Sequence, residues 1–195
     1  MTTAAPSQGV LTSFVRFFVN PRGSMRAVLD SKPSEGRILA FGMFAALIVF
    51  IRKTTPIFQA EDVSDAQLIA FIEHLVASLF FLPLGFYLAA VLATLIAKAF
   101  RGTGSWYEGR VAFFWALFLS SVVLVLAHLS FQLLGAYLPF AVLIMIWCAA
   151  MVFCPWALAQ CFAEAFNFSR TWLVFVVTCS PMIVLYISYA LETQL

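Results

Sequence analysis

Charged side chains are scarce in this sequence. Asp, Glu, Lys and Arg make up 10% of its 195 residues, whereas hydrophobic residues make up 64%. A soluble domain carries about 25% charged residues, which it needs to cover its surface. The scarcity therefore excludes a soluble globular domain. It is typical of a chain whose surface faces lipid, so the sequence predicts an all-α integral membrane protein.

Cysteine is also sparse, and the obvious loops contain none. Cys148, Cys154, Cys161 and Cys179 all lie in apolar runs or at the end of one. This placement argues against a disulfide framework, because a free cysteine in such a run behaves as a small apolar residue. Cys154 and Cys161 share a helix face, but no His or third Cys stands near them to complete a zinc site. We therefore predict no metal site.

Motifs for catalysis and cofactor binding are missing as well. The serines lie in apolar runs or turns, without the His and Asp relay that would make one of them a nucleophile. The glycine-rich segment 101–105 lacks the Gly-Lys-Ser/Thr ending of a P-loop, and no β-strand is expected before it. The net charge of +2 does not indicate a nucleic-acid partner. We predict no enzymatic activity, no cofactor and no nucleic-acid partner.

Long apolar runs dominate the chain. A helix that crosses a membrane needs about 20 mostly apolar residues. On this criterion residues 38–195 predict a single bundle of about five transmembrane helices. Pro83 and Pro155 lie inside two of these helices and predict kinks. The spans are expected at about 37–53, 68–97, 111–134, 139–159 and 172–190.

The loop before the third span carries a clear local signal. Ser105 is followed three residues later by Glu108, which matches a capping box. In that motif each side chain accepts a hydrogen bond from the backbone N–H of the other residue. The pattern predicts that a helix starts at Ser105.

Residues 1–37 are expected to form a basic, cytoplasmic N-terminal segment. Between residues 11 and 29, Phe and aliphatic residues are interspersed with three arginines. This mixture predicts two short amphipathic helices on the membrane surface, with apolar side chains toward lipid and arginines toward the headgroups. Pro21 interrupts the stretch, so the second helix is expected to begin near Ser24.

The distribution of Lys and Arg predicts the orientation. The segment before the first span holds five of these residues, the loop 98–110 holds three, and Arg170 follows the fourth span. Arg52 and Lys53 fall on the opposite side. Because basic residues are enriched in cytoplasmic loops, this predicts a cytoplasmic N-terminus and, with five spans, a C-terminus outside.

Small residues recur at every fourth position in two of the predicted spans. In lipid, helices associate where small residues let their backbones approach closely. The stripes therefore predict the inner seams of one bundle, with a dimer interface as the alternative. They consist of Gly85, Ala89, Ala93 and Ala97 in the second span, and of Ala112, Ala116 and Ser120 in the third.

A few polar residues stand near the ends of the spans, where an ionisable group is a candidate for function. His128 and Gln132 lie four residues apart near the outer end of the third span. They fit a structural hydrogen bond, with a proton relay or a ligand contact as the alternative. Glu164 lies at the cytoplasmic end of the fourth span. It is expected to pair with Arg170 or with a base of the loop 98–110, and so to anchor the bundle there; the alternative is a functional cytoplasmic site.

The order of these parts resembles the YIP family, the Ypt/Rab-interacting membrane proteins, and in particular its bacterial branch. The resemblance covers residues 15 to 190 in layout. The residues that carry it are Phe17-Phe-Val-Asn-Pro-Arg22, Lys32-Pro-Ser-Glu-Gly-Arg37, Gly102-Thr-Gly-Ser-Trp-Tyr107 and Arg110-Val-Ala-Phe-Phe-Trp-Ala-Leu-Phe118.

The resemblance implies a bundle of five spans with a cytosolic N-terminus, in a bacterial inner membrane. Eukaryotic members of the family are linked to Rab GTPases and vesicle traffic. This sequence lacks their long cytosolic N-terminal domain and their Asp-Leu-Tyr-Gly-Pro motif. A GTPase partner is therefore not carried over, and the family implies no catalytic residues.

Together these features predict a non-enzymatic membrane scaffold or accessory subunit. It is expected to act through helix–helix contacts and a basic cytoplasmic face, with membrane lipids and other membrane proteins as partners. The alternative is a small permease or lipid-handling protein, with a cavity bordered by the prolines and by His128, Gln132 or Glu164. The residues expected to make the interactions are Arg16, Arg22, Arg26, Arg101, Arg110 and Glu164.

Overall fold

The computed structural model describes residues 10–58 and 64–179, and every regular element in these ranges is a helix. The all-α prediction is therefore confirmed for this part of the chain. Residues 171–179 are helical as well. The elements are α1 (Val10–Val19), α2 (Pro21–Asp30), α3 (Glu35–Phe58), α4 (Asp65–Val76), the π-helical turn η1 (Ala77–Phe81), α5 (Leu82–Ala99), α6 (Trp106–Leu134) and α7 (Phe140–Ala165).

Four stretches of helix within the described ranges are long and apolar enough to cross a membrane. By length and composition they are consistent with the prediction of a membrane protein with transmembrane helices. The fifth predicted span, 172–190, has its first eight residues in the helix 171–179. Residues 180–190 lie outside the described residues. The four stretches are Glu35–Thr55, Asp65–Ala99, Trp106–Leu134 and Phe140–Ala165.

Two capping boxes fix where helices begin. Ser105 Oγ accepts a hydrogen bond from the Glu108 N–H at 3.2 Å, and Glu108 Oε2 accepts one from the Ser105 N–H at 2.6 Å. The predicted start of α6 is thus confirmed. Ser64 and Gln67 form the same motif at the start of α4. Both boxes satisfy backbone N–H groups that a helix start leaves without partners.

The second long span changes its helical hydrogen-bond pattern just before a proline. Residues 65–99 form α4, η1 and α5 without a break, a length of about 52 Å at 1.5 Å per residue. The π-helical turn Ala77–Phe81 ends two residues before Pro83. Proline lacks a backbone N–H and perturbs the hydrogen bonds of the preceding turn, which is where π-turns arise. The irregularity predicted near Pro83 takes this form.

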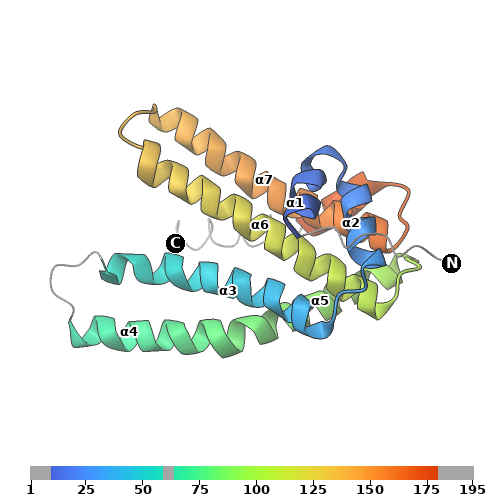
Figure 1. Cartoon of the computed structure of the whole chain (residues 1–195), viewed down its shortest axis with the longest axis horizontal. Coiled ribbons are helices and arrows are strands. Elements are labelled where there is room, and N and C mark those ends of the chain that lie inside the picture. The colour runs from blue at the N-terminus through green and yellow to red at the C-terminus, as the bar shows by residue number, and fades with distance from the viewer. Residues whose placement is uncertain (1–9, 59–63, 180–195) are drawn as a thin grey trace, which may run out of the picture.

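α6 is the central helix. Half of its most apolar stretch is buried, compared with 17–33% in the other three candidate spans. It packs against α3, α5 and α7. Figure 1 shows α3 and α6 starting near α2 and then diverging, with α4 lying beside α3 and α7 beside α6. The largest buried side chains, which include Phe17, Phe114, Trp115 and Phe166, belong to one core cluster.

The predicted stripe on α6 lies inside the protein, since Ala112, Ala116 and Ser120 are all buried. Gly109 continues the same face, and a Cβ there would collide with the side chain of Thr94 on α5. At Gly42 of α3 a Cβ would lie 2.5 Å from a ring carbon of Phe114. Small residues thus set the close approach of α3 and α5 to α6.

The predicted stripe on α5 needs correction. Gly85 is exposed, and a Cβ there would meet no atom within 4 Å. Ala89 and Ala93 are half-buried, and Ala97 is buried. The residues that α5 buries against α6 are displaced from the expected line, because the helix turns a different face inward. They are Ala90, Thr94 and Ala97, together with Pro83 at the start of the helix.

Candidate functional site

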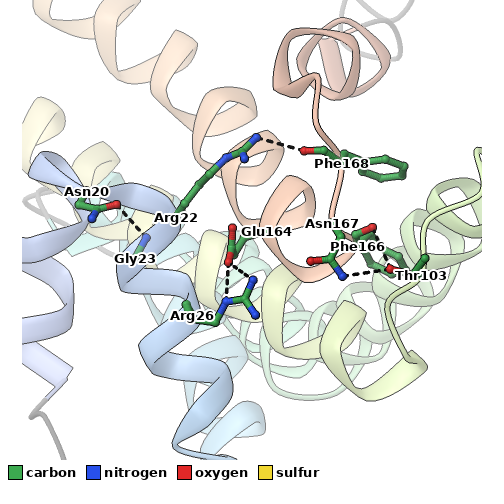
Figure 2. A network of polar contacts seen from close by, with 9 residues as sticks. All are labelled: Asn20, Arg22, Gly23, Arg26, Thr103, Glu164, Phe166, Asn167 and Phe168. Atoms are coloured by element: carbon green, nitrogen blue, oxygen red, sulfur yellow. Dashed lines mark hydrogen bonds and ion pairs between the residues drawn. The ribbon is translucent and has the colours of Figure 1, made fainter.

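The second N-terminal helix begins at Pro21, three residues before the position predicted. Asn20 is its N-cap, and Asn20 Oδ1 accepts a hydrogen bond from the Gly23 N–H at 2.8 Å (Figure 2). Proline is well suited to the first helical position, where an N–H has no partner within the helix. The error arose because Pro21 was interpreted as a break, whereas Asn-Pro is a start signal.

Arg26 of α2 forms an ion pair with Glu164 near the end of α7 (Figure 2). Arg26 Nε donates to Glu164 Oε1 at 2.6 Å. The Glu164 side chain is 13% exposed and that of Arg26 is 55% exposed. Glu164 was predicted to pair with Arg170 or with the loop 98–110, so its partner is corrected to Arg26. The pair joins the first and last parts of the described chain.

Arg22 makes a second connection in the same direction. Its Nη2 donates to the backbone carbonyl of Phe168 at 3.2 Å, and it also bonds the Thr171 hydroxyl. Arg22 and Arg26 were predicted to face lipid headgroups. Instead, both guanidinium groups hold α2 against the end of α7 and the segment that follows it. Each guanidinium thus makes hydrogen bonds within the protein.

Some apolar residues of α1 and α2 pack on the protein. Phe17 and Met25 have no exposed surface, and the Phe17 ring lies 5.7 Å from that of Trp156 on α7. The Ser24 hydroxyl donates to the Ser13 carbonyl at 2.6 Å, which ties the two helices together. The prediction that the apolar sides of both helices face lipid is therefore corrected for these residues.

α1 nevertheless keeps a second, exposed apolar stripe. Leu11, Val15 and Val19 follow one another at intervals of four residues and are 76%, 59% and 87% exposed. They lie on one face of the helix, away from the buried Phe17. We call these three residues the α1 stripe.

The glycine-rich loop between α5 and α6 packs against the end of α7. Gly104 and Gly102 lie so close to Phe166 that a Cβ at either position would approach its ring within 3 Å. The Thr103 N–H donates to the Phe166 carbonyl at 3.2 Å, and Asn167 Nδ2 donates to Thr103 Oγ1 at 3.0 Å (Figure 2). The sequence predicted no nucleotide site in this loop. Its glycines serve close packing.

The starts of α3 and α6 are joined by two polar contacts. Arg110 Nη2 lies 2.8 Å from Glu35 Oε1 in an ion pair, and the Tyr107 hydroxyl donates to the Pro33 carbonyl at 2.7 Å. Arg110, which the sequence predicts to make interactions, thus pairs with Glu35 within the protein. These contacts place the first residues of both helices at the same end of the molecule as α2.

Four exposed basic side chains at this end have no polar partner among the described residues. They belong to Lys32, Arg37, Arg101 and Arg170, and these side chains form neither a hydrogen bond nor an ion pair there. We call them the free cations. Of the five arginines predicted from sequence to interact, Arg101 alone belongs to this set. Arg16 is exposed and has contacts of its own, and the other three are bound as described.

Two of the free cations occupy strained backbone positions. Lys32 has φ 45° and Arg101 has φ 64°, both in the left-handed region that favours glycine. Lys32 follows the end of α2 and Arg101 follows α5. At Arg101 the next N–H, that of Gly102, bonds back to the Ala97 carbonyl at 3.0 Å, the closing bond of a Schellman motif. Glycine would adopt this backbone conformation with less strain. The presence of arginine at a strained position is therefore a pointer to a function of its side chain.

The far ends of the helices hold fewer polar contacts. Gln132 Nε2 lies 3.1 Å from His128 Nε2, so the predicted pair forms a hydrogen bond along α6. Within the described residues, no three His, Cys, Asp or Glu side chains lie close enough to hold a metal ion. The four cysteines form no disulfide.

Comparison with known proteins adds no name to this site. No family model, no curated protein and no solved structure matches the chain. The resemblance to the YIP family stays a prediction, and the argument about function depends on the residues themselves.

Proposed function

We propose that the chain is a non-enzymatic membrane scaffold or accessory subunit whose basic end binds anionic lipid headgroups and a membrane partner. The free cations carry this proposal. They are exposed and unpaired within the described chain, whereas the neighbouring Arg22, Arg26 and Arg110 are already bound. Each basic residue near an anionic membrane surface contributes about 1 kcal/mol to binding.

The α1 stripe supports the same role. An exposed apolar face beside basic residues is typical of a helix that lies in the membrane interface, with its apolar side chains between lipid tails. Leu11, Val15 and Val19 supply that face on the helix that precedes the docked α2. In this proposal the N-terminal helices are interfacial, as the sequence predicted, but through the α1 stripe.

The helix–helix contacts of the proposed scaffold have a candidate surface on the second long span. The segment 65–99 buries the smallest share of its apolar stretch, 17%. Most of its length is therefore available to lipid or to another membrane protein. A scaffold or accessory subunit needs such a face.

The remaining assignments belong to the same proposal. The chain is a member of the bacterial branch of the YIP family, in a bacterial inner membrane, with five spans, a cytoplasmic N-terminus and a C-terminus outside. Nine of the eleven Lys and Arg residues belong to the end that is cytoplasmic in this orientation. Lys32→Cys and Asp65→Cys variants test it in intact cells with an impermeant maleimide. Labelling of Asp65→Cys alone is expected, and labelling of Lys32→Cys would reverse the orientation.

Lipid binding is tested with the four free cations changed to Gln. The full-length protein is reconstituted with phosphatidylglycerol, and the lipids it retains are counted by native mass spectrometry. We expect about a fivefold loss of retained phosphatidylglycerol for each residue changed. The matched control swaps Lys for Arg and Arg for Lys at the same positions and should retain the lipid. Equal retention by both variants would defeat the proposal.

Partner binding is tested by affinity purification from native membranes in a gentle detergent. A scaffold or accessory subunit should co-purify with a stoichiometric partner, and the variant that lacks the free cations should recover less of it. Purification of a lone monomer or homo-oligomer would favour the second candidate function, a lipid-handling protein or small permease. A cavity of about 320 Å³, lined by residues of α3 and α6, favours that candidate.

A further inference from the structure

A cavity of about 320 Å³ lies between α3 and α6, at the ends that diverge from α2. Its walls are mostly aliphatic and aromatic, with Phe44 and Ile48 from α3 and Val125 and Leu129 from α6. Polar side chains line it as well, and Arg52, His128 and Gln132 are among them. The cavity therefore has apolar walls and a basic group.

The ion pair Glu35–Arg110 is a reference point for the depth of this polar end along α3 and α6. Both helices start beside that pair and run in the same direction, as Figure 1 shows. Arg52 and His128 follow Glu35 and Arg110 by almost the same number of residues, which at 1.5 Å per residue is about 26 Å. The hydrocarbon core of a membrane is about 30 Å thick. If the ion pair lies at one interface, the polar end of the cavity lies near the other.

The length of the cavity matches one leaflet. Along α6 it extends from Ser121 to Gln132, a rise of about 17 Å. Half of a hydrocarbon core is about 15 Å. A molecule that fills this cavity therefore has an apolar part about one leaflet long, and a polar part beside Arg52.

The polar groups of the cavity are not equally available. The Thr55 and Ser121 hydroxyls donate to carbonyls of their own helices, Ile51 at 2.7 Å and Leu117 at 2.8 Å. His128 and Gln132 bond each other. Arg52 is exposed and makes no hydrogen bond or ion pair with any described residue. It is also the one cationic residue among those that line the cavity.

We propose that this cavity binds one phospholipid with an anionic headgroup, in the leaflet far from the basic end. An acyl chain lies along the apolar walls, and the guanidinium of Arg52 binds the phosphate, an anion that arginine recognises with paired N–H groups. This inference rests on the lipid-handling candidate and deepens it by naming the ligand. It uses none of the residues that carry the scaffold proposal.

The test is photo-labelling of the full-length protein in vesicles. The probes are phosphatidylglycerol and phosphatidylcholine with a diazirine in one acyl chain, and labelled peptides are mapped by mass spectrometry. We expect labels in residues 44–55 and 121–132, with a preference for phosphatidylglycerol. Arg52→Gln should lower that preference about fivefold, and the neighbouring Lys53→Gln, outside the cavity lining, should leave it unchanged.

A second pair of variants tests the apolar walls. Val125→Trp fills the cavity and should abolish labelling there, whereas Leu133→Trp, exposed and outside the lining, should not. Leu129→Trp at the exposed part of the lining replaces Val125→Trp if that variant does not fold. Labelling spread evenly over all helices, or unchanged by both tryptophans of the cavity, would overturn the proposal. If Arg52→Gln and the unchanged protein show the same preference for phosphatidylglycerol over phosphatidylcholine, the proposed binding of an anionic headgroup is wrong.

A photo-crosslinker placed at Val125 identifies the occupant directly. A product with phospholipid mass supports the proposal. A product with residues 180–195, with a second copy or with another protein would overturn it. Because the free cations lie at the opposite end, the variant that removes them should not change any of these results. Failure here and failure of the scaffold proposal are therefore separate outcomes.

Discussion

The two ends of the helical bundle differ in how they are held together. At the end where α2 docks, ion pairs, side-chain hydrogen bonds and glycine contacts join α2, α3, α6, α7 and the α5–α6 loop. At the other end α3 and α6 diverge around a cavity, and the hydrogen bond between His128 and Gln132 stays within one helix. The difference teaches that polar contacts between helices gather at one end, while the other end holds a cavity between α3 and α6.

The largest expected effect on stability is that of removing a buried aromatic side chain from the end where α2 docks. Phe114 has no exposed surface and contacts Tyr87 with ring centroids 4.7 Å apart. Phe114→Ala should lower the free energy of unfolding by about 3 kcal/mol, because it leaves a cavity in the core. The measurement is unfolding by SDS titration in micelles. Phe81→Ala, at a side chain 69% exposed, is the control and should have little effect.

A bulky residue at a glycine contact should have the next largest effect. Gly42→Leu would drive a side chain into the buried Phe114 ring and lower the free energy of unfolding by about 2 kcal/mol. A Cβ added at Gly85 would meet no atom within 4 Å, so Gly85→Leu should leave stability unchanged or slightly higher. Equal destabilisation by the two variants would restore the stripe that the sequence predicted on α5. The same SDS titration measures both.

The ion pair between α2 and α7 should give a smaller, specific effect. A double-mutant cycle of Arg26→Gln and Glu164→Gln should yield a coupling energy of about 1 kcal/mol, since the carboxylate is largely buried but the guanidinium is half exposed. The cycle of Arg170→Gln with Glu164→Gln should yield none. Coupling in the second cycle and not in the first would return Glu164 to its predicted partner.

The smallest effect concerns the strained free cation Arg101. Arg101→Gly should raise the free energy of unfolding by up to about 1 kcal/mol, because glycine adopts φ 64° without strain. The same variant should retain less phosphatidylglycerol in native mass spectrometry. Asn167→Gly, also at positive φ, is the control: it loses the hydrogen bond to Thr103 and should gain nothing. A stability gain with unchanged lipid retention would leave Arg101 without the proposed role.

Local patterns in the sequence were reliable guides to local structure. Apolar runs predicted the long helices, and Ser105 with Glu108 predicted the start of α6, because both signals act within a few turns of chain. The Asn20–Pro21 start of α2 is equally local, and it was available in the sequence but was interpreted as a break.

Long-range partners were the part that the sequence could not supply. Nothing near Glu164 indicates that its partner is Arg26, 138 residues away, because any of several bases at the same end satisfies the charge. The same limit applies to the basic residues. Charge alone does not separate Arg22, which binds the protein, from Arg37, which is free. The face that α5 turns inward also depends on α6, so the small residues of α5 did not determine it.

The ion pair between Arg26 and Glu164 joins two helices that are synthesised at different times. Ribosomes add about 5–20 residues per second, so α7 emerges on the order of ten seconds after α2. Until then Phe17 and Met25 have no α7 to pack against, and both arginines of α2 lack their acceptors. Newly made α1 and α2 therefore lack these partners until α7 has been synthesised. Closure of this contact therefore marks the moment when α7 has been synthesised and has reached α2.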